Sequence, residues 1–301
     1  MPSWREILDE IQAHGSTFDA VRRKYLSELF KYTDRNVIVY YSGWLQKGSL
    51  SKEGIDFSIN DADINGFMTT IYKMGKAKGL DLILHTPGGD IAATESLVEY
   101  LRQIFGTNIR AIIPQLAMSC GTMIACSCKE IIMGKHSSIG PIDPQIFGLP
   151  AQGILEEFNK ARDEILQNQL SAYIWQPIIA KYSPTLIGEC DKSITWSEKI
   201  VEEWLTTGMF KDEENGVEKA KDVISKLGSH ELTKTHNKHI SIKQAKDFGL
   251  IVSPLESDQL LQDKVLSIHH ACIQTLSATP AYKIIENHEG IAFIQSYGRI
   301  N

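Results

Sequence analysis

Between residues 36 and 133 the chain alternates short apolar runs with segments of helical periodicity, and this alternation constrains the fold more than any other feature. Strands are predicted at 36–41, 80–85, 109–114 and 130–133, with helices at 61–76, 91–105 and 120–128 between them. Strand–helix–strand repeats at this spacing fold into right-handed βαβ units. The predicted fold class is therefore α/β, with a mainly parallel sheet of βαβ units.

Helical patterns also flank this region. Two helices are expected before the first strand, at 4–13 and 18–32, and a long helical stretch covers 152–182. Further helices are predicted within 192–227, and a last strand at 291–295. The sheet should therefore carry extra N-terminal helices and a helical region on its C-terminal side.

Two glycine- and serine-containing motifs follow consecutive predicted strands. The first is His-Thr-Pro-Gly-Gly-Asp at 85–90, and the second is Ala-Met-Ser-Cys-Gly-Thr at 117–122. Ligands bind at this edge of an open α/β sheet. Gly88 and Gly89 allow the backbone to approach a ligand closely, and their N–H groups can hold an oxyanion. Ser119 precedes a predicted helix, so the Cys120 N–H is a second natural donor. Together they predict a serine nucleophile facing an oxyanion hole.

Three segments together resemble the serine dehydrogenase proteinase family. They are the 85–90 motif, residues 117–125 (Ala-Met-Ser-Cys-Gly-Thr-Met-Ile-Ala) and residues 137–145 (Ser-Ser-Ile-Gly-Pro-Ile-Asp-Pro-Gln). A weaker similarity covers residues 239–252. This family is grouped with signal peptide peptidase A, and it shares the fold of the Clp protease proteolytic subunit and crotonase. The resemblance implies a Clp/crotonase-like peptidase domain over 36–260, a helical extension over 1–35, and a C-terminal helix and strand extension over 261–301.

The resemblance also implies roles for individual residues. Ser119 takes the place of the nucleophile, and Gly89 and Cys120 take the places of the oxyanion donors, with Gly88 in the same turn. The implied activity is serine endopeptidase hydrolysis of a polypeptide through an acyl-enzyme, independent of ATP and metal and without a cofactor. The chain contains neither a Walker sequence nor HExxH. Relatives commonly form closed homo-oligomers, so we expect a homo-oligomer here.

The base that activates Ser119 has two candidates. Lys160 lies 41 positions after Ser119, a separation that resembles that of the Ser-Lys dyad in some relatives of signal peptide peptidase, but it falls on the polar face of its predicted helix. His136 follows the strand at 130–133 and resembles the histidine of Clp-type triads. Lys135, Lys181 and Lys192 are weaker alternatives. Asp143 is interpreted as a turn residue, and His230, His236 and His239 as a solvated loop rather than a zinc site.

Composition limits the remaining possibilities. The formal charge is −6, which gives no basic footprint for a nucleic-acid partner. Five cysteines, an odd number, fit reduced buried thiols in a cytoplasmic protein. No run of about 18 apolar residues predicts a membrane anchor. Two alternative functions stay open: acyl-CoA chemistry on the same fold, and a catalytically inactive assembly or binding protein.

Overall fold

A seven-stranded sheet forms the centre of the protein, in a computed structural model that describes residues 4–13, 18–228 and 236–298. Its strand order is β10-β5-β3-β2-β1-β11-β12, and the run from β10 to β1 is parallel. The strands are β1 (Asn36–Ser42), β2 (Leu80–His85), β3 (Ile109–Ile113), β5 (Glu130–Met133), β10 (Val252–Pro254), β11 (Ala281–Asn287) and β12 (Ala292–Ser296). The predicted α/β class with a mainly parallel sheet is confirmed.

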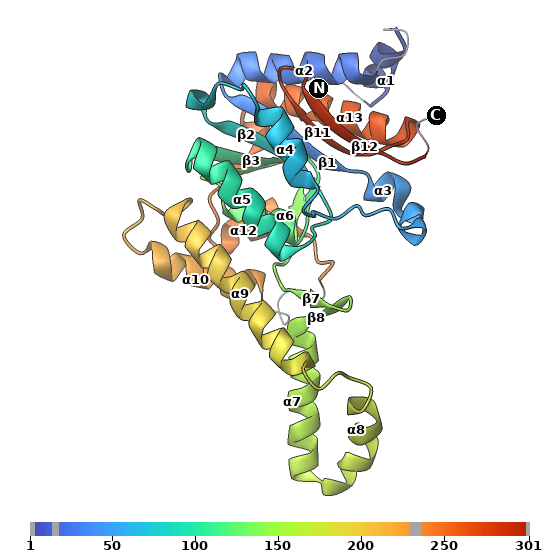
Figure 1. The fold of residues 1–301 in the computed structure, drawn as a ribbon. Coiled ribbons are helices and arrows are strands. Elements are labelled where there is room, and N and C mark those ends of the chain that lie inside the picture. Colours follow the sequence, from blue (N-terminus) through green and yellow to red (C-terminus); the bar gives the residue numbers. More distant parts are fainter. Residues whose placement is uncertain (1–3, 14–17, 229–235, 299–301) are drawn as a thin grey trace.

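Helices cover both faces of this sheet (Figure 1). On one face α2 packs against α13, and Val37, Val39 and Ile83 point into this layer. On the other face lie α4, α5, α6, α9 and α10, against Ile38, Leu82 and Leu84. The helices are α1 (Trp4–Ala13), α2 (Phe18–Thr33), α3 (Trp44–Lys47), α4 (Asp63–Ile71), α5 (Ile91–Phe105), α6 (Cys120–Cys126), α7 (Ala151–Gln167), α8 (Ala172–Ile179), α9 (Leu186–Thr207), α10 (Gly216–Leu227), α12 (Ile242–Asp247) and α13 (Gln259–Ala278). Burial on both faces explains why the central strands are mainly apolar.

Small strands complete the edge of the sheet where the motifs lie. A three-stranded sheet joins β4 (Leu116–Ala117), β6 (Ser138–Ile139) and β9 (Ile240–Ser241). A hairpin pairs β7 (Gln145–Ile146) with β8 (Leu149–Pro150). Strand β4 follows β3 and β6 follows β5, so the chain segments beyond the carboxyl ends of these two strands are joined by a short pairing.

The predicted helical stretch at 152–182 is interrupted. Helix α7 stops at Gln167, and the Asn168 side chain accepts a hydrogen bond from the Leu170 N–H at 3.1 Å, which starts a separate turn before α8. Helices α7, α8 and the first part of α9 form an arm that projects from the body (Figure 1). No helix of the described ranges is long and apolar enough to cross a membrane.

The C-terminal segment joins the central sheet. Strand β11, which is not predicted from the sequence, pairs antiparallel with β1, and β12 follows at the sheet edge. Helix α13 packs on α2 and on β11. The predicted last strand at 291–295 is confirmed as β12, but the division of the chain into a domain and two extensions stays a prediction.

Candidate functional site

The chain leaving β2 runs beside the chain leading to α6. Thr86 pairs in parallel with Ala117: its N–H donates to Leu116 O at 3.1 Å, and its carbonyl accepts from the Met118 N–H at 3.0 Å. The two predicted motifs are thereby brought into direct contact. A Cβ placed on Gly88, whose φ is +101°, would lie 2.5 Å from the Ser119 Cβ. Only glycine permits this approach.

Ser119 adopts a backbone conformation that side chains rarely tolerate. Its φ is 51° and its ψ is −118°, and α6 begins at the next residue. Its carbonyl accepts hydrogen bonds from the N–H groups of Thr122 (2.8 Å) and Met123 (3.1 Å), which fix the turn. A serine held in a strained turn between a strand and a helix is typical of nucleophiles in α/β hydrolytic enzymes.

The Gly88-Gly89 turn presents one N–H group, that of Gly89, without an acceptor among the described residues. Ile59 pairs with Gly89 in parallel: its N–H donates to Gly88 O (2.8 Å), and its carbonyl accepts from the Asp90 N–H (2.9 Å). This pairing turns the polar groups of Gly89 itself away from Ile59. On that side the Cys120 thiol donates to Gly89 O at 3.0 Å.

Three N–H groups were predicted to form the oxyanion hole. One of them already donates a hydrogen bond within the protein, and the other two donate none to the described residues. The Gly88 N–H donates to Thr86 Oγ1 at 3.2 Å. Within the described part of the chain, the N–H groups of Gly89 and Cys120 have no acceptor. Two unengaged donors beside a strained serine are the arrangement that an oxyanion hole requires. Burial raises the pKa of the Cys120 thiol, so this side chain stays protonated and is a poor nucleophile.

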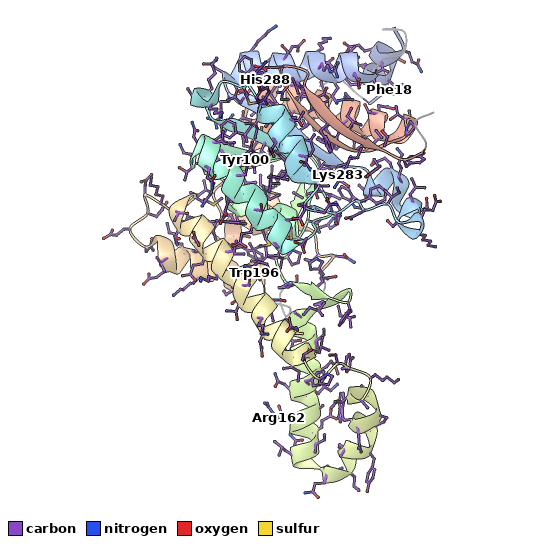
Figure 2. All side chains as sticks on the ribbon, viewed as in Figure 1. Phe18, Tyr100, Arg162, Trp196, Lys283 and His288 are labelled. Carbon is purple, nitrogen blue, oxygen red and sulfur yellow. The ribbon has the colours of Figure 1, made fainter. Side chains whose placement is uncertain are left out.

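A cavity of about 450 Å³ opens over Ser119. The Gly88-Gly89 turn and the start of α6 form its floor, and Trp196 of α9, which Figure 2 labels, forms part of its wall. Its lining also includes Ser58, Ile91, Met123, Ile142, Asp143, Ser193 and His236. The site therefore has an apolar wall and several polar groups, as ligand pockets usually do.

A histidine and a buried carboxylate share this cavity. His236 Nδ1 lies 2.8 Å from Asp143 Oδ1, and Asp143 is only 4% exposed. A carboxylate at Nδ1 favours the tautomer with the proton on that nitrogen and leaves Nε2 as an acceptor. From the sequence, Asp143 is interpreted as a turn residue and His236 as part of a solvated loop, and neither interpretation includes this pairing. The available signal was that Asp143 belongs to the 137–145 motif.

Lys160 and His136 are not brought into this cavity. Lys160 is exposed on α7, where its ammonium lies 5.9 Å from the centre of the Trp175 ring. His136 is exposed beyond β5. Neither residue lines the pocket of Ser119. The interpretation of the three loop histidines as a solvated loop rather than a zinc site includes His230, which lies outside the described residues.

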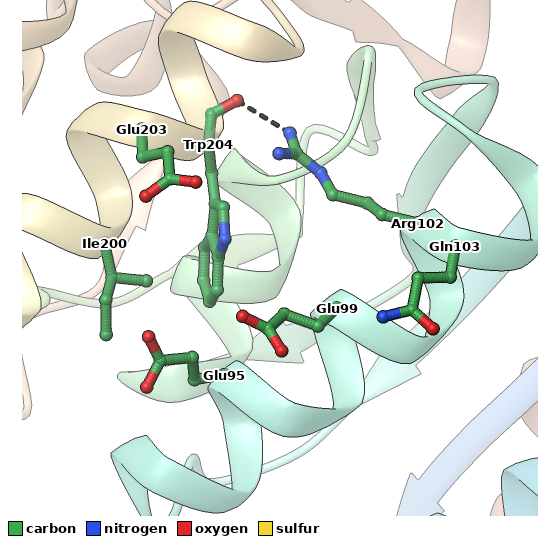
Figure 3. A pocket seen from close by; sticks show the side chains of 7 residues that line it. All are labelled: Glu95, Glu99, Arg102, Gln103, Ile200, Glu203 and Trp204. Carbon is green, nitrogen blue, oxygen red and sulfur yellow. Dashed lines mark hydrogen bonds between the residues drawn. The ribbon is translucent and has the colours of Figure 1, made fainter.

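A second hollow lies between α5 and α9 (Figure 3). Its lining is acidic, with Glu95, Glu99 and Glu203, but Arg102 turns away from them. The Arg102 guanidinium donates to Trp204 O (2.7 Å) and Ser127 O (2.8 Å). Arg102 thus ties α5, the end of α6 and α9 together, and α9 supplies Trp196 and Ser193 to the cavity over Ser119.

The fold and the strained serine define a class, the α/β proteins of the ClpP-like type. The family model of ClpP-like SDH-type serine proteinases matches residues 21–262, and the chain belongs to this family. The resemblance found in the sequence is thereby confirmed.

Two curated relatives come from Methanocaldococcus jannaschii and are uncharacterized proteins. MJ1495 is 34% identical over 174 residues, which is 58% of this chain and 52% of the relative. MJ0137 is 31% identical over 198 residues, which is 63% of this chain and 59% of the relative. The chain therefore matches between half and three fifths of the length of these relatives.

Proposed function

We propose that the protein is a serine endopeptidase that needs neither ATP nor a metal. The observation that carries this proposal is the shared cavity, which is lined by the strained Ser119, by Gly89 and Cys120 with their unengaged N–H groups, and by a histidine–aspartate pair. Acyl transfer needs a nucleophile, a base and oxyanion donors, and each is represented in this one pocket. The family assignment supports peptide bonds as the substrate.

In the proposed mechanism, Ser119 Oγ attacks the peptide carbonyl while His236 Nε2 takes its proton. The oxyanion of the tetrahedral intermediate accepts hydrogen bonds from the Gly89 and Cys120 N–H groups. Asp143 holds the imidazole and stabilises its positive charge. The proton then passes to the leaving amine, and water hydrolyses the acyl-enzyme by the reverse sequence. We prefer His236 to Lys160 and His136 as the base because, of these three, it is the one that lines the pocket.

The test is labelling with a fluorophosphonate probe combined with peptide hydrolysis. Wild type should react, and Ser119→Ala should not. His236→Gln and Asp143→Asn should lower kcat by about 10²–10⁴-fold. The matched control is His239→Gln, since His239 is an exposed histidine three positions from His236; it should leave kcat unchanged.

Other outcomes identify what is wrong. Equal labelling of wild type and Ser119→Ala would refute the serine nucleophile and favour acyl-CoA chemistry. A large loss of kcat in Lys160→Ala or His136→Ala, with His236→Gln active, would identify Lys160 or His136 as the base in place of His236. A folded wild type without any reaction would favour an assembly or binding protein.

We further propose that a second copy of the chain covers the arm. Leu166, Leu170, Tyr173 and Ile174 are 67–78% exposed at its tip, and residues 165–180 contain no charged side chain. No residue of α8 is buried. Side chains of this size expose on the order of 100 Å² each, which is a large part of the roughly 800 Å² that each partner buries in a standard interface.

The same arm carries a matching groove. A cavity of about 450 Å³ between α7, α8 and α9 is lined by Leu155, Phe158, Ile165, Ile179 and Ile187. A projecting apolar tip and an apolar groove on one element are self-complementary, which is the condition for a two-fold interface. The two arms would therefore pack side by side in opposite directions.

Sedimentation equilibrium tests this arrangement. Wild type should be an oligomer at micromolar concentration, and Tyr173→Glu with Ile174→Glu should be a monomer. Tyr72→Glu is the matched control, because Tyr72 is 68% exposed on the body rather than on the arm. A monomeric wild type, or one that binds neutral phospholipid vesicles through the arm, would contradict the proposal.

The state of the cysteines is consistent with a reducing compartment. All five are buried and free of disulfides. We propose the cytoplasm as the site of action, because disulfides are rare there. Fractionation of cells that express the tagged chain would test it.

A further inference from the structure

The segment Ser58 to Asn60 forms one side of the site, although it lies far from both motifs in the sequence. Ser58 lines the cavity over Ser119. Ile59 is paired with Gly89 so closely that a Cβ on Gly89 would lie 2.3 Å from both Ile59 N and Ile59 O. The position of Ile59 therefore decides where the Gly89 N–H points.

A buried cation holds this segment. Lys283 of β11 donates from Nζ to Ser58 O at 2.8 Å, and to the two oxygens of Asp63 at 2.8 and 3.0 Å. Asp63 Oδ2 also accepts from the Tyr40 hydroxyl (2.7 Å) and from the Asn60 N–H (3.1 Å). Lys283 and Asp63 are each 1% exposed. Their charges must satisfy one another inside the protein, so the geometry of the cluster is rigid.

The cluster joins three elements to the site. Tyr40 comes from β1, Asp63 starts α4, and Lys283, which Figure 2 labels, comes from β11. The Lys283 ammonium contacts the carbonyl before Ile59, and Asp63 contacts the N–H after it. Ile59 is thus anchored on both sides, and its own N–H and carbonyl are directed to the Gly88-Gly89 turn.

We propose that Lys283 is a positioning residue for the oxyanion hole. It acts through Ser58 and Ile59 on the Gly89 peptide and does not touch the substrate. This inference rests on the proposed function, because it assumes that the Gly89 N–H stabilises an oxyanion. Loss of Lys283 should weaken binding of the transition state and leave binding of the ground state unaltered.

Glu286 supplies a matched control on the same strand. It is fully buried and is paired with Arg22 and Arg23 of α2, on the opposite face of the sheet. Removing either charge breaks a buried ion pair of β11. Only Lys283, of these two, contacts the segment beside Gly89, so a purely structural effect would appear equally in both variants.

The experiment measures kcat, KM and inhibition by a peptide aldehyde, whose adduct mimics the tetrahedral intermediate, in the full chain. Lys283→Met should lower kcat about 10²-fold, the effect of losing one oxyanion donor, with KM within about 3-fold of wild type. Aldehyde affinity should fall by the same factor as kcat. Lys283→Arg should restore part of the activity. Glu286→Gln should lower the melting temperature and leave kcat unchanged.

Several results would overturn the inference. Unchanged kcat in a folded Lys283→Met protein would do so, as would an equal loss of kcat in Glu286→Gln. Should Lys283→Met not fold, Tyr40→Phe decides, because it removes one hydrogen bond to Asp63 and should lower kcat about 3- to 10-fold with KM constant. A wild type that does not react with the fluorophosphonate refutes the proposed function itself, and the role of Lys283 with it.

Discussion

His85, the last residue of β2, is buried as an uncharged side chain, and its replacement by phenylalanine should remove part of the acid sensitivity of the fold. Its ring lies 4.4 Å from that of Trp44 and 5.5 Å from that of His269, between ring centres. Neither ring nitrogen has a hydrogen-bond partner among the described residues. Burial lowers the pKa of His85 from 6.5 to about 3. His85→Phe fills the same space and removes the group that must lose its charge.

The magnitude follows from this pKa difference. Between about pH 6.5 and 3 the unfolded chain binds a proton at this position that the folded protein does not, so stability falls as the pH falls. Each pH unit below 6.5 costs about 1.4 kcal/mol. Lowering the pH from about 7.5 to 5 should therefore cost the wild type about 2 kcal/mol through His85 alone, and this contribution should be absent in His85→Phe.

Urea unfolding of the wild type and of His85→Phe, each at about pH 7.5 and 5, measures this effect. The loss of unfolding free energy on acidification is compared between the two proteins. Burial is the largest cause that lowers the pKa of His269 well below its usual value. His85→Phe should therefore keep some acid sensitivity. His239→Phe, which removes an exposed histidine, should match the wild type. Equal losses of unfolding free energy in wild type and His85→Phe would refute the reasoning. So would a variant that is several kcal/mol less stable at pH 7.5, because it would show that the imidazole makes an essential polar contact.

Three further predictions concern the site and its support. Gly89→Ala should lower kcat by about 10²-fold or more with the circular dichroism spectrum retained, because the added methyl group would collide with the Ile59 backbone. Arg102→Gln should lower the free energy of unfolding by about 2–4 kcal/mol in urea titrations, since it loses charged hydrogen bonds to buried carbonyls. Iodoacetamide at neutral pH should leave fluorophosphonate labelling of Ser119 intact, because burial raises the pKa of the Cys120 thiol. Rapid loss of labelling would contradict the last prediction.

Strands β1, β2, β3 and β5 of the parallel sheet were predictable because their sequences are mainly apolar, whereas β10 was not predicted. Strand β2 and helix α5 have the predicted boundaries. Strand β11 was missed because Lys283, Glu286 and Asn287 interrupt its apolar pattern. Each of these polar side chains is buried against a partner from a distant segment, and such pairing leaves no periodic signal in the sequence.

Within the candidate site, Ser119 and the Gly88-Gly89 turn were predictable from the sequence, whereas the Asp143–His236 pair was not. Ser119 and the Gly88-Gly89 turn lie in local motifs, and the structure brings them together as the strand order required; their chemical roles stay predictions. Asp143 and His236 are 93 positions apart, with the whole arm between them. Their contact depends on how the chain returns to β9, which no local pattern specifies. Likewise, no local pattern in the sequence around Ile59 indicates that it pairs with Gly89.

The place of β11 in the sheet has a consequence for the order in which the protein matures. Strand β1 has two neighbours, β2 and β11, and β11 is made long after β1 and β2. During synthesis Ser119, Asp143 and His236 all emerge before Lys283. We therefore expect a growing chain to contain Ser119 before the Ile59 segment can be fixed. Under the proposed function, we expect the oxyanion hole to be complete only after β11 has inserted beside β1, so a ribosome-bound chain would not yet hydrolyse peptides.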